Sequence, residues 1–287
     1  KKEVFWLKTS KKSNWHLTAN KLNNHCLINN KQNKMLILNS PNNPTGTNNE
    51  ELEKIAEVCK KHNVIVISDE IYSELDFKGN YNSITHFYPE GTIITSGLSK
   101  WCGAGGWRLG TLIFPEKLSL LCLRIRSLAS ETFTSVSAPI QYAAIKAYSE
   151  SHHDYLMNSR KILNLLAKFV YRELKLVGID SLEPQGGFYM LCDFKNINLK
   201  NNIKNSASAL CKKILLETGF AMLPGSNFGI CDKELITRIA FVDFNGEKAL
   251  EHMSKNKVIE NKDMKEFFPK IVNGINALKK WIKQNSF

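Results

Sequence analysis

The sequence predicts an α/β protein with a three-layer α/β/α domain built on a mostly parallel sheet, followed by a smaller α+β domain. Two observations lead to this prediction. Short, β-branched apolar runs alternate with a helical pattern through the first half of the chain, which is typical of strands joined by crossover helices. Beyond about residue 165 the pattern changes to shorter, mixed elements. We therefore place the two domains at residues 1–165 and 166–287.

The first strands follow a strand–helix–strand pattern. Residues 34–40, KMLILNS, form a short apolar run that ends in the turn sequence PNNPTG, which indicates a buried strand. A helix is expected next, because Thr47 and Glu50 have capping-box spacing and apolar residues then recur at helical intervals up to residues 60–63. The run VIVIS at 64–68 is typical of a strand covered on both faces. Together these segments predict a right-handed parallel unit.

The remaining elements extend this picture. Strands are expected at 92–96 and 107–114, and long helical stretches are expected within 134–175. The second domain is expected to end in an amphipathic helix near 262–284. Its other elements are the segments GGFYMLCDF, SASALCKKILLET and LITRIAFV.

Composition excludes several classes of protein. The chain has 287 residues, of which 43% are hydrophobic, enough to bury a sizeable core. It contains no run of eighteen apolar residues and no signal-peptide pattern, so we expect a cytoplasmic protein with no membrane partner. The net charge is +12, but the lysines are scattered among asparagines without an arginine-aromatic stripe, so we expect no nucleic-acid partner. Seven cysteines without a CxxC pair indicate reduced thiols, neither a disulfide framework nor a zinc site.

Polar residues follow each of the first three predicted strands. Asn43 comes after the first strand, Asp69 and Tyr72 after the second, and Ser99 and Lys100 after the third. In open parallel sheets, ligands bind beyond the carboxyl ends of the strands. We therefore expect these side chains to line one pocket.

The segment around Lys100 suggests a nucleophile beside a phosphate site. Only six of the 39 basic residues are arginine, so Arg108 in GLSKWCGAGGWRLG is not explained by background composition. A partly desolvated lysine next to a cationic arginine loses proton affinity and becomes an amine able to form a Schiff base. Ser99 and Arg108 would bind a phosphate group, the arginine through a bidentate pair.

The other pocket residues complete a site for pyridoxal 5′-phosphate. Asp69 would supply a fixed anion that keeps a pyridine nitrogen protonated, so that the ring acts as an electron sink. Tyr72 and Asn43 would hydrogen-bond the ring oxygen. These roles all belong to one cofactor.

Six segments in order resemble the signatures of class I/II aminotransferases, the fold type I pyridoxal phosphate enzymes. The resemblance implies that Lys100 holds the cofactor, that Asp69 pairs with the ring nitrogen, and that Arg238 binds the substrate α-carboxylate. Arg238 is the only arginine in the last hundred residues. The six segments are NSPNNPTG, SDEIYSEL, GLSKWCGAGGWRLG, GGFYM, PGSNFG and TRIAFVDF.

The resemblance also implies the reaction and the partners. An L-amino acid and a 2-oxo acid would exchange an amino group, and the enzyme would be a homodimer whose residues 131–141 reach the neighbouring site. The resemblance begins downstream of the family's N-terminal part, so we expect the first domain to be incomplete and the natural chain to be longer. One position departs from the family pattern, because Gly97 stands where many relatives have serine.

Alternative interpretations remain open from the sequence. The same cofactor residues would serve a β-lyase, and some transcription regulators carry an aminotransferase-like sensor domain. Asp69 could mark only a helix start, Asn43 only a turn, and Arg238 only a structural ion pair. Phe188 and Tyr189 are expected to be core residues beside the substrate. The HHD sequence at 152–154 lacks a second ligand cluster, so we expect no metal site.

Overall fold

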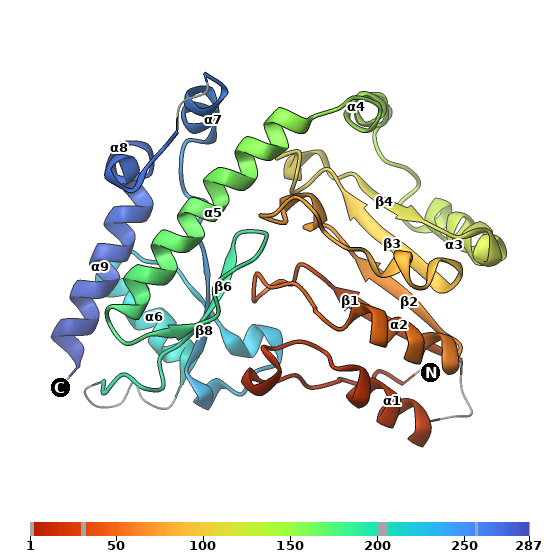
Figure 1. Cartoon of the computed structure of the whole chain (residues 1–287), viewed down its shortest axis with the longest axis horizontal. Helices are drawn as coiled ribbons and strands as arrows, with labels where there is room; N and C mark the ends of the chain where they lie inside the picture. The colour runs from red at the N-terminus through yellow and green to blue at the C-terminus, as the bar shows by residue number, and fades with distance from the viewer. Residues whose placement is uncertain (1–2, 30–32, 200–205, 256–257, 287) are drawn as a thin grey trace. The chain divides into compact units, whose positions relative to one another are not determined.

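The computed structural model describes residues 3–29, 33–199, 206–255 and 258–286 (Figure 1). Within these residues the chain divides into two compact units. The first unit comprises Lys1–Pro41, Asn48–Leu75 and Asn80–His152, and the second unit comprises Asn42–Thr47, Asp76–Gly79 and His153–Phe287. None of the helices in the described part of the chain is long and apolar enough to cross a membrane.

A four-stranded sheet with the order β1-β2-β3-β4 forms among the described residues of the first unit (Figure 1). β1 and β3 both pair parallel with β2, and β4 pairs antiparallel with β3. The predicted mostly parallel sheet is therefore confirmed. The strands are β1 (Lys34–Asn39), β2 (Val64–Asp69), β3 (Thr92–Gly97) and β4 (Gly110–Ile113).

Helices α1 and α2 pack with one face of this sheet. The helices of the first unit are α1 (Ala19–Ile28), α2 (Leu52–Lys61), α3 (Ser119–Thr132) and α4 (Ala138–Ser149). Leu36 and Val66 point into a core that also contains Ile55 of α2. On the other face Ile37 is 73% exposed and Ile67 is half-buried. The expectation of a strand covered on both faces is met only in part, because the residues of β2 alternate between buried and half-buried.

The start of α2 differs from the prediction. The expected capping box at Thr47 and Glu50 is wrong, because α2 begins at Leu52 and the Thr47 hydroxyl lies 2.7 Å from that of Thr45. Buried Asn49 makes the side-chain hydrogen bonds just before this helix. Its side-chain oxygen accepts from the Glu51 N–H at 2.9 Å, and its side-chain amide donates to the Leu17 carbonyl at 3.0 Å. A tertiary contact thus decides where the helix starts.

β4 is shorter than the predicted strand at 107–114. Trp107 ends a short 3-10 turn (Gly105–Trp107), and Arg108 has a left-handed backbone with φ 56°. A residue in that conformation cannot continue a strand, so pairing with β3 begins only at Gly110.

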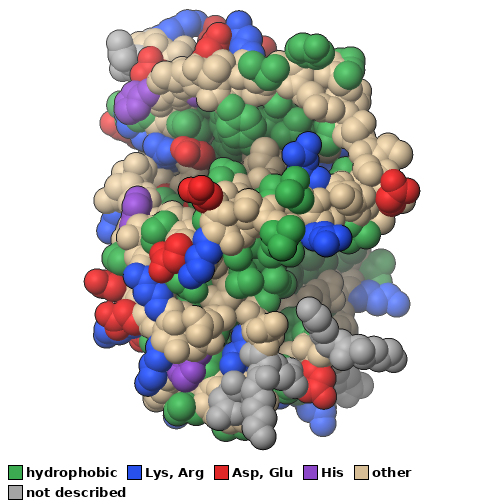
Figure 2. Space-filling view, turned by 90° about the vertical axis from the view of Figure 1, so that its right-hand side faces the viewer, with side chains coloured by type: hydrophobic (Ala, Val, Ile, Leu, Met, Phe, Trp, Pro, Cys, Tyr) green, Lys and Arg blue, Asp and Glu red, His purple; other side chains and the backbone are tan. Residues whose placement is uncertain are grey.

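Helices α3 and α4 contribute little to a core. No residue of α3 is buried, and Ala144 is the one buried residue of α4. Figure 2 looks at the side that carries these helices in Figure 1 and shows hydrophobic side chains at the surface. The exposed apolar residues of the two helices include Leu120, Leu123, Leu128, Tyr142, Ile145 and Tyr148.

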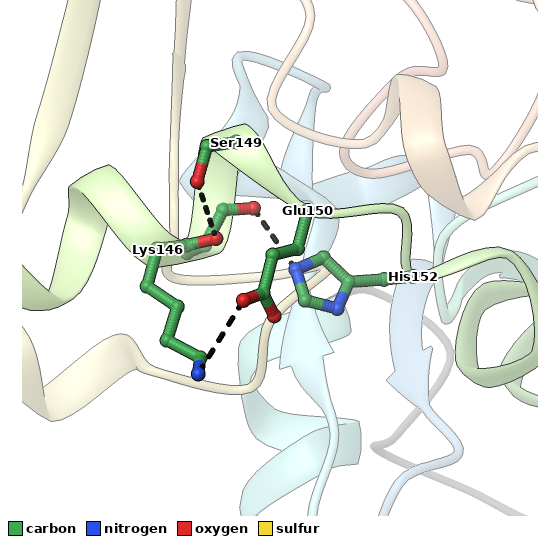
Figure 3. A network of polar contacts seen from close by, with 5 residues as sticks. Lys146, Ser149, Glu150 and His152 are labelled. Carbon is green, nitrogen blue, oxygen red and sulfur yellow. Dashed lines mark hydrogen bonds and ion pairs between the residues drawn. The ribbon is translucent and has the colours of Figure 1, made fainter.

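Local polar contacts close the end of α4 (Figure 3). His152 folds back so that its Nε2 lies 3.0 Å from the Ala147 carbonyl oxygen. Lys146 pairs with Glu150 at 3.4 Å, and the Ser149 hydroxyl donates to the Lys146 carbonyl at 3.4 Å. The His152 and Ser149 contacts satisfy carbonyl groups that a helix end otherwise leaves unpaired.

A second four-stranded sheet, with the order β5-β6-β8-β7, forms among the described residues of the second unit, and its pairs are antiparallel. Its strands are β5 (Asp180–Ser181), β6 (Tyr189–Asp193), β7 (Leu223–Pro224) and β8 (Ile236–Ala240). Its helices are α5 (His153–Lys175), α6 (Ala207–Thr218), α7 (Gly246–Ser254), α8 (Met264–Phe267) and α9 (Pro269–Asn285). Residues of β6, α5, α6, α7 and α9 share one buried core.

The C-terminal helix of this half differs from the prediction. The predicted terminal helix at 262–284 is broken into α8 and α9, because Pro269 cannot donate a backbone hydrogen bond and instead starts a new helix. The compact units change at His152, before α5 begins, whereas the sequence places a boundary near residue 165, within α5. The division at 165 stays a prediction.

Candidate active site

Asp69 is the last residue of β2 and lies at the carboxyl edge of the sheet in the first unit. Its Oδ1 accepts from the Ile71 N–H at 3.3 Å and from the Thr95 hydroxyl at 3.4 Å. Thr95 is its register partner on β3. Burial raises the pKa of Asp69, and the two hydrogen bonds and the charge of Lys100 oppose that rise. The carboxylate is therefore held in place but poorly solvated.

Lys100 and Tyr72 lie near this carboxylate. Tyr72 is buried in the turn after β2, and the Lys100 Nζ lies 5.6 Å from the centroid of its ring. Because Lys100 also acts electrostatically on Asp69, the three predicted catalytic side chains are brought together. Trp101 anchors this segment, with its ring 6.0 Å from Tyr148 and 5.7 Å from His152.

Ser99 and Arg108 lie on the loop that carries Lys100, between β3 and β4. The ends of this loop are joined by hydrogen bonds from the Leu98 N–H to the Leu109 carbonyl and from the Ala104 N–H to the Leu98 carbonyl. Arg108 is exposed and its Nη1 donates to the Gly105 carbonyl at 2.7 Å. In this structure the Arg108 guanidinium thus bonds to its own loop.

The pairing of β3 with β4 leaves no space for a side chain at Gly97. A Cβ added there would lie 2.6 Å from the Leu109 carbonyl oxygen and 3.0 Å from the Gly110 Cα. Real Cβ atoms do not approach backbone atoms so closely, so this pairing of β3 with β4 needs glycine. The sequence showed the departure but not its cause.

Asn43 and Arg238 meet in the second unit. The Arg238 Nη1 donates to the Asn43 Oδ1 at 2.9 Å, although the residues are 195 positions apart. Backbone hydrogen bonds at Gly46 hold the turn that contains Asn43 in this position. The Gly46 carbonyl accepts from the Gln185 N–H at 2.7 Å and from the Gly186 N–H at 3.0 Å. The turn after β1 is thereby attached to the segment before β6.

The guanidinium of Arg238 is set among aromatic rings. Its Cζ lies 4.1 Å from the centroid of the Tyr189 ring and 5.0 Å from that of Phe228. Its Nε is buried and donates to no other described residue. A buried donor without a partner is costly, so this edge of the guanidinium is suited to an acceptor from outside the chain.

The predicted site residues thus form two groups. Five lie in the first unit (Asp69, Tyr72, Ser99, Lys100 and Arg108), and two lie in the second (Asn43 and Arg238). Sequence reasoning missed Thr95 as a partner of Asp69 and Phe228 as a neighbour of Arg238. It expected Tyr189 to be a core residue beside the substrate, not a neighbour of Arg238. From the sequence, GGFYMLCDF and LITRIAFV are only unassigned elements of the second domain. Reading them as a pair of neighbouring strands, as β6 and β8 are, could have connected Tyr189 to Arg238.

Glu70 was also missed. It is buried, and its Oε1 accepts from the hydroxyls of Ser68 at 2.8 Å and Ser83 at 2.6 Å. Burial raises the pKa of Glu70, and the two serine hydroxyls oppose the rise. This acid supports the turn between Asp69 and Tyr72.

Asp69→Asn is expected to stabilise the cofactor-free chain at neutral pH. A raised folded-state pKa means that the folded chain holds this proton more tightly than the unfolded chain. The stabilising contribution is complete below the unfolded value and is lost as the pH rises through the folded value. The gain in urea midpoint from Asp69→Asn should therefore be present at pH 7 and absent at about pH 3, below the reference pKa of aspartate.

Asp232→Asn provides a control of opposite sign. Hydrogen bonds from Ser206 and Ser208 lower the pKa of Asp232. Its contribution is present above the unfolded value and lost as the pH falls through the folded one, so this variant should lose stability at pH 7. A lower urea midpoint for Asp69→Asn at pH 7 would contradict burial as the dominant influence on Asp69.

Known proteins resemble this chain over most of its length. The family described as aminotransferase class I and II matches residues 2–250. A probable N-acetyl-LL-diaminopimelate aminotransferase of Bacillus subtilis is 34% identical over 190 residues, which is 66% of this chain and 46% of that protein. An aspartate aminotransferase of Thermotoga maritima is 33% identical, over 66% of this chain and 47% of that protein. The chain thus spans about half the length of these curated relatives.

Solved structures give the same result for the fold. The aromatic aminotransferase of Pyrococcus horikoshii has a TM-score of 0.75 and 26% identity, over 96% of this chain and 66% of that chain. The crystal structure of the aspartate aminotransferase of Thermotoga maritima has a TM-score of 0.73 and 24% identity, over 96% and 62%. These likenesses confirm the predicted α/β fold. The family match over residues 2–250 establishes that the chain belongs to the class I and II aminotransferases.

Proposed function

We propose that this chain carries the catalytic residues of a pyridoxal phosphate-dependent aminotransferase that moves an amino group between an L-amino acid and a 2-oxo acid. Its family is pyridoxal phosphate-dependent. The observation that carries the proposal is the convergence of an amine, a carboxylate and a phenol, those of Lys100, Asp69 and Tyr72, at one edge of the first sheet.

The residues fit the cofactor chemically. Asp69 ends a strand as a poorly solvated anion, which suits a protonated ring nitrogen as partner. The Tyr72 hydroxyl suits the ring oxygen, and Ser99 and Arg108 offer donors to the phosphate from the Lys100 loop. When bound, pyridoxal phosphate supplies an electron sink for the charge that develops at the substrate α-carbon.

The chain's own groups would then divide the work. Lys100 would hold the cofactor covalently and move a proton at the substrate α-carbon as general acid and base. Arg238, with Asn43 on its Nη1, would grip the substrate α-carboxylate through the edge that contains its unpaired Nε. This grip would fix which α-carbon bond reacts.

A panel of amino acids tests the proposed reaction. The 287-residue chain is mixed with pyridoxal phosphate and each L-amino acid, first without and then with a 2-oxo acid acceptor. We expect a stoichiometric half-reaction without acceptor and turnover with it. Turnover without an acceptor that releases ammonia and pyruvate would instead indicate a β-lyase, and no reaction with any amino acid would contradict the proposal.

We also propose that the protein acts as a cytoplasmic homodimer. The resemblance to the family supports both statements, and the unburied apolar side chains of α3 and α4 supply a surface that a second copy could cover (Figure 2). Sedimentation equilibrium tests the dimer. A monomer at all concentrations would contradict it.

A further inference from the structure

Two aromatic residues contact the guanidinium of Arg238. Tyr189 opens β6, and the antiparallel register pairs Tyr189 with Ala240 and Leu191 with Arg238. Tyr189 and Arg238 are therefore diagonal neighbours two positions apart, within reach across the sheet. Phe228 is the last residue of a 3-10 turn (Gly225–Phe228). Two separate parts of the second unit thus converge on one cation.

The contacts are of the kind that orients a guanidinium. The Cζ atom lies 4.1 Å from the Tyr189 ring centroid and 5.0 Å from that of Phe228, both within the range of cation–π attraction. The rings offer no hydrogen-bond acceptor in this contact, so they hold the face of the guanidinium and leave its donors for other groups. Nη1 is occupied by Asn43, and Nε is buried with no partner among the described residues.

The turn that carries Phe228 is itself held firmly. The Ser226 hydroxyl donates to the Asp232 Oδ1 at 3.3 Å, and the same carboxylate accepts from the hydroxyls of Ser206 at 2.5 Å and Ser208 at 2.8 Å. Gly229, with φ 79°, ends the turn in a conformation that favours glycine. Hydrogen bonds through Asp232 therefore hold the turn that carries Phe228 against the start of α6.

We propose that Tyr189 and Phe228 are positioning residues for carboxylate binding by Arg238. The two rings fix the plane of the guanidinium and keep water from its face, so that the edge containing Nε is presented, already oriented, to a carboxylate. The inference rests on the proposed carboxylate role of Arg238 and goes beyond it, because it assigns a function to two further residues, whose rings contact the guanidinium of Arg238. Tyr189 has the larger share because its ring is closer.

NMR of the arginine side chains measures both carboxylate binding and hydrogen exchange at the Arg238 Nε–H. The chain has six arginines, so the Nε–H region of a nitrogen-15 spectrum at mildly acidic pH contains few signals, and Arg238→Lys identifies that of Arg238. Acetate is the probe, with chloride at matched ionic strength as the salt control. We expect the Arg238 signal to shift saturably with acetate and its Nε–H to exchange slowly with water.

The ring variants separate positioning from general packing. Tyr189→Leu should weaken acetate binding roughly 3- to 30-fold and speed exchange at Nε–H, because a cation–π contact of this kind is lost. Tyr189→Phe keeps the ring and should stay within about 2-fold of the unaltered chain. Phe228→Leu should have a smaller effect in the same direction. Tyr171→Leu, at an aromatic residue packed on the same core, is the matched control and should leave the Arg238 signal unchanged.

The outcomes distinguish the positioning role of Tyr189 and Phe228 from the proposed carboxylate binding by Arg238. If acetate does not shift the Arg238 signal in the unaltered chain, the carboxylate role fails and the inference falls with it. If acetate binds but Tyr189→Leu and Phe228→Leu leave affinity and exchange unchanged, the positioning role is wrong while the proposed function stands. Circular dichroism shows whether each variant is folded, and Phe228→Leu decides the question should Tyr189→Leu not fold.

Discussion

Replacing Lys100 with alanine is expected to abolish covalent attachment of pyridoxal phosphate and to remove transamination. Lys100 supplies the only amine that the structure brings near both Asp69 and Tyr72 among the described residues. Loss of its acid–base role alone should lower turnover by roughly 10²–10⁴-fold. Loss of the covalent attachment adds to that effect.

Borohydride reduction followed by peptide mass mapping measures the attachment. The chain is incubated with pyridoxal phosphate, reduced and digested, and the modified lysine is identified. Lys117→Ala, at another lysine of the first unit in a short turn (Glu116–Leu118), is the matched control and should keep the Lys100 label. Turnover retained by Lys100→Ala, with the label at a different lysine, would overturn the assignment of this residue.

Gly46→Ala is expected to destabilise the second unit and to displace Asn43 from Arg238. Gly46 has φ 71°, and a Cβ there would meet the Tyr189 carbonyl oxygen far inside van der Waals contact and the Pro184 Cβ at 3.0 Å. The left-handed backbone costs a non-glycine residue about 1–2 kcal/mol, and overpacking costs about 1–3 kcal/mol. The free energy of unfolding should therefore fall by roughly 2–5 kcal/mol.

Gly178→Ala separates the two contributions. Gly178 also lies in the second unit and has φ 80°, but nothing lies within 4 Å of an added Cβ. This variant should lose only the backbone share, about 1–2 kcal/mol, in urea unfolding. Equal losses for the two variants would contradict the close packing of the turn against the Tyr189 backbone. The same NMR spectrum of Arg238 would report whether Asn43 has moved.

Local patterns in the sequence predicted the first three strands, the family and the candidate site residues. The short apolar runs identified β1, β2 and β3 and their parallel pairing, because a buried strand has a characteristic composition and length. Six short segments carried the family, and they contain every residue proposed for the cofactor and the carboxylate. Those residues are recognisable because the chemistry demands particular side chains at short, fixed spacings.

Local patterns failed where a distant residue competes for the same group. α2 starts at Leu52 because buried Asn49 is needed by the Leu17 carbonyl. Gly97 is glycine because a Cβ there would lie 2.6 Å from the Leu109 carbonyl oxygen. Neither partner can be seen in the neighbouring sequence.

The sequence by itself determined the kind of fold, the family and the identity of the chemical groups. Only the tertiary structure decided which groups act together: Lys100 beside Tyr72 and Asp69, and Arg238 with Asn43, Tyr189 and Phe228. The physical reason is that propensity and periodicity act over a few residues. A contact between residues 195 positions apart depends instead on how β6, β8 and the turn at Gly46 pack.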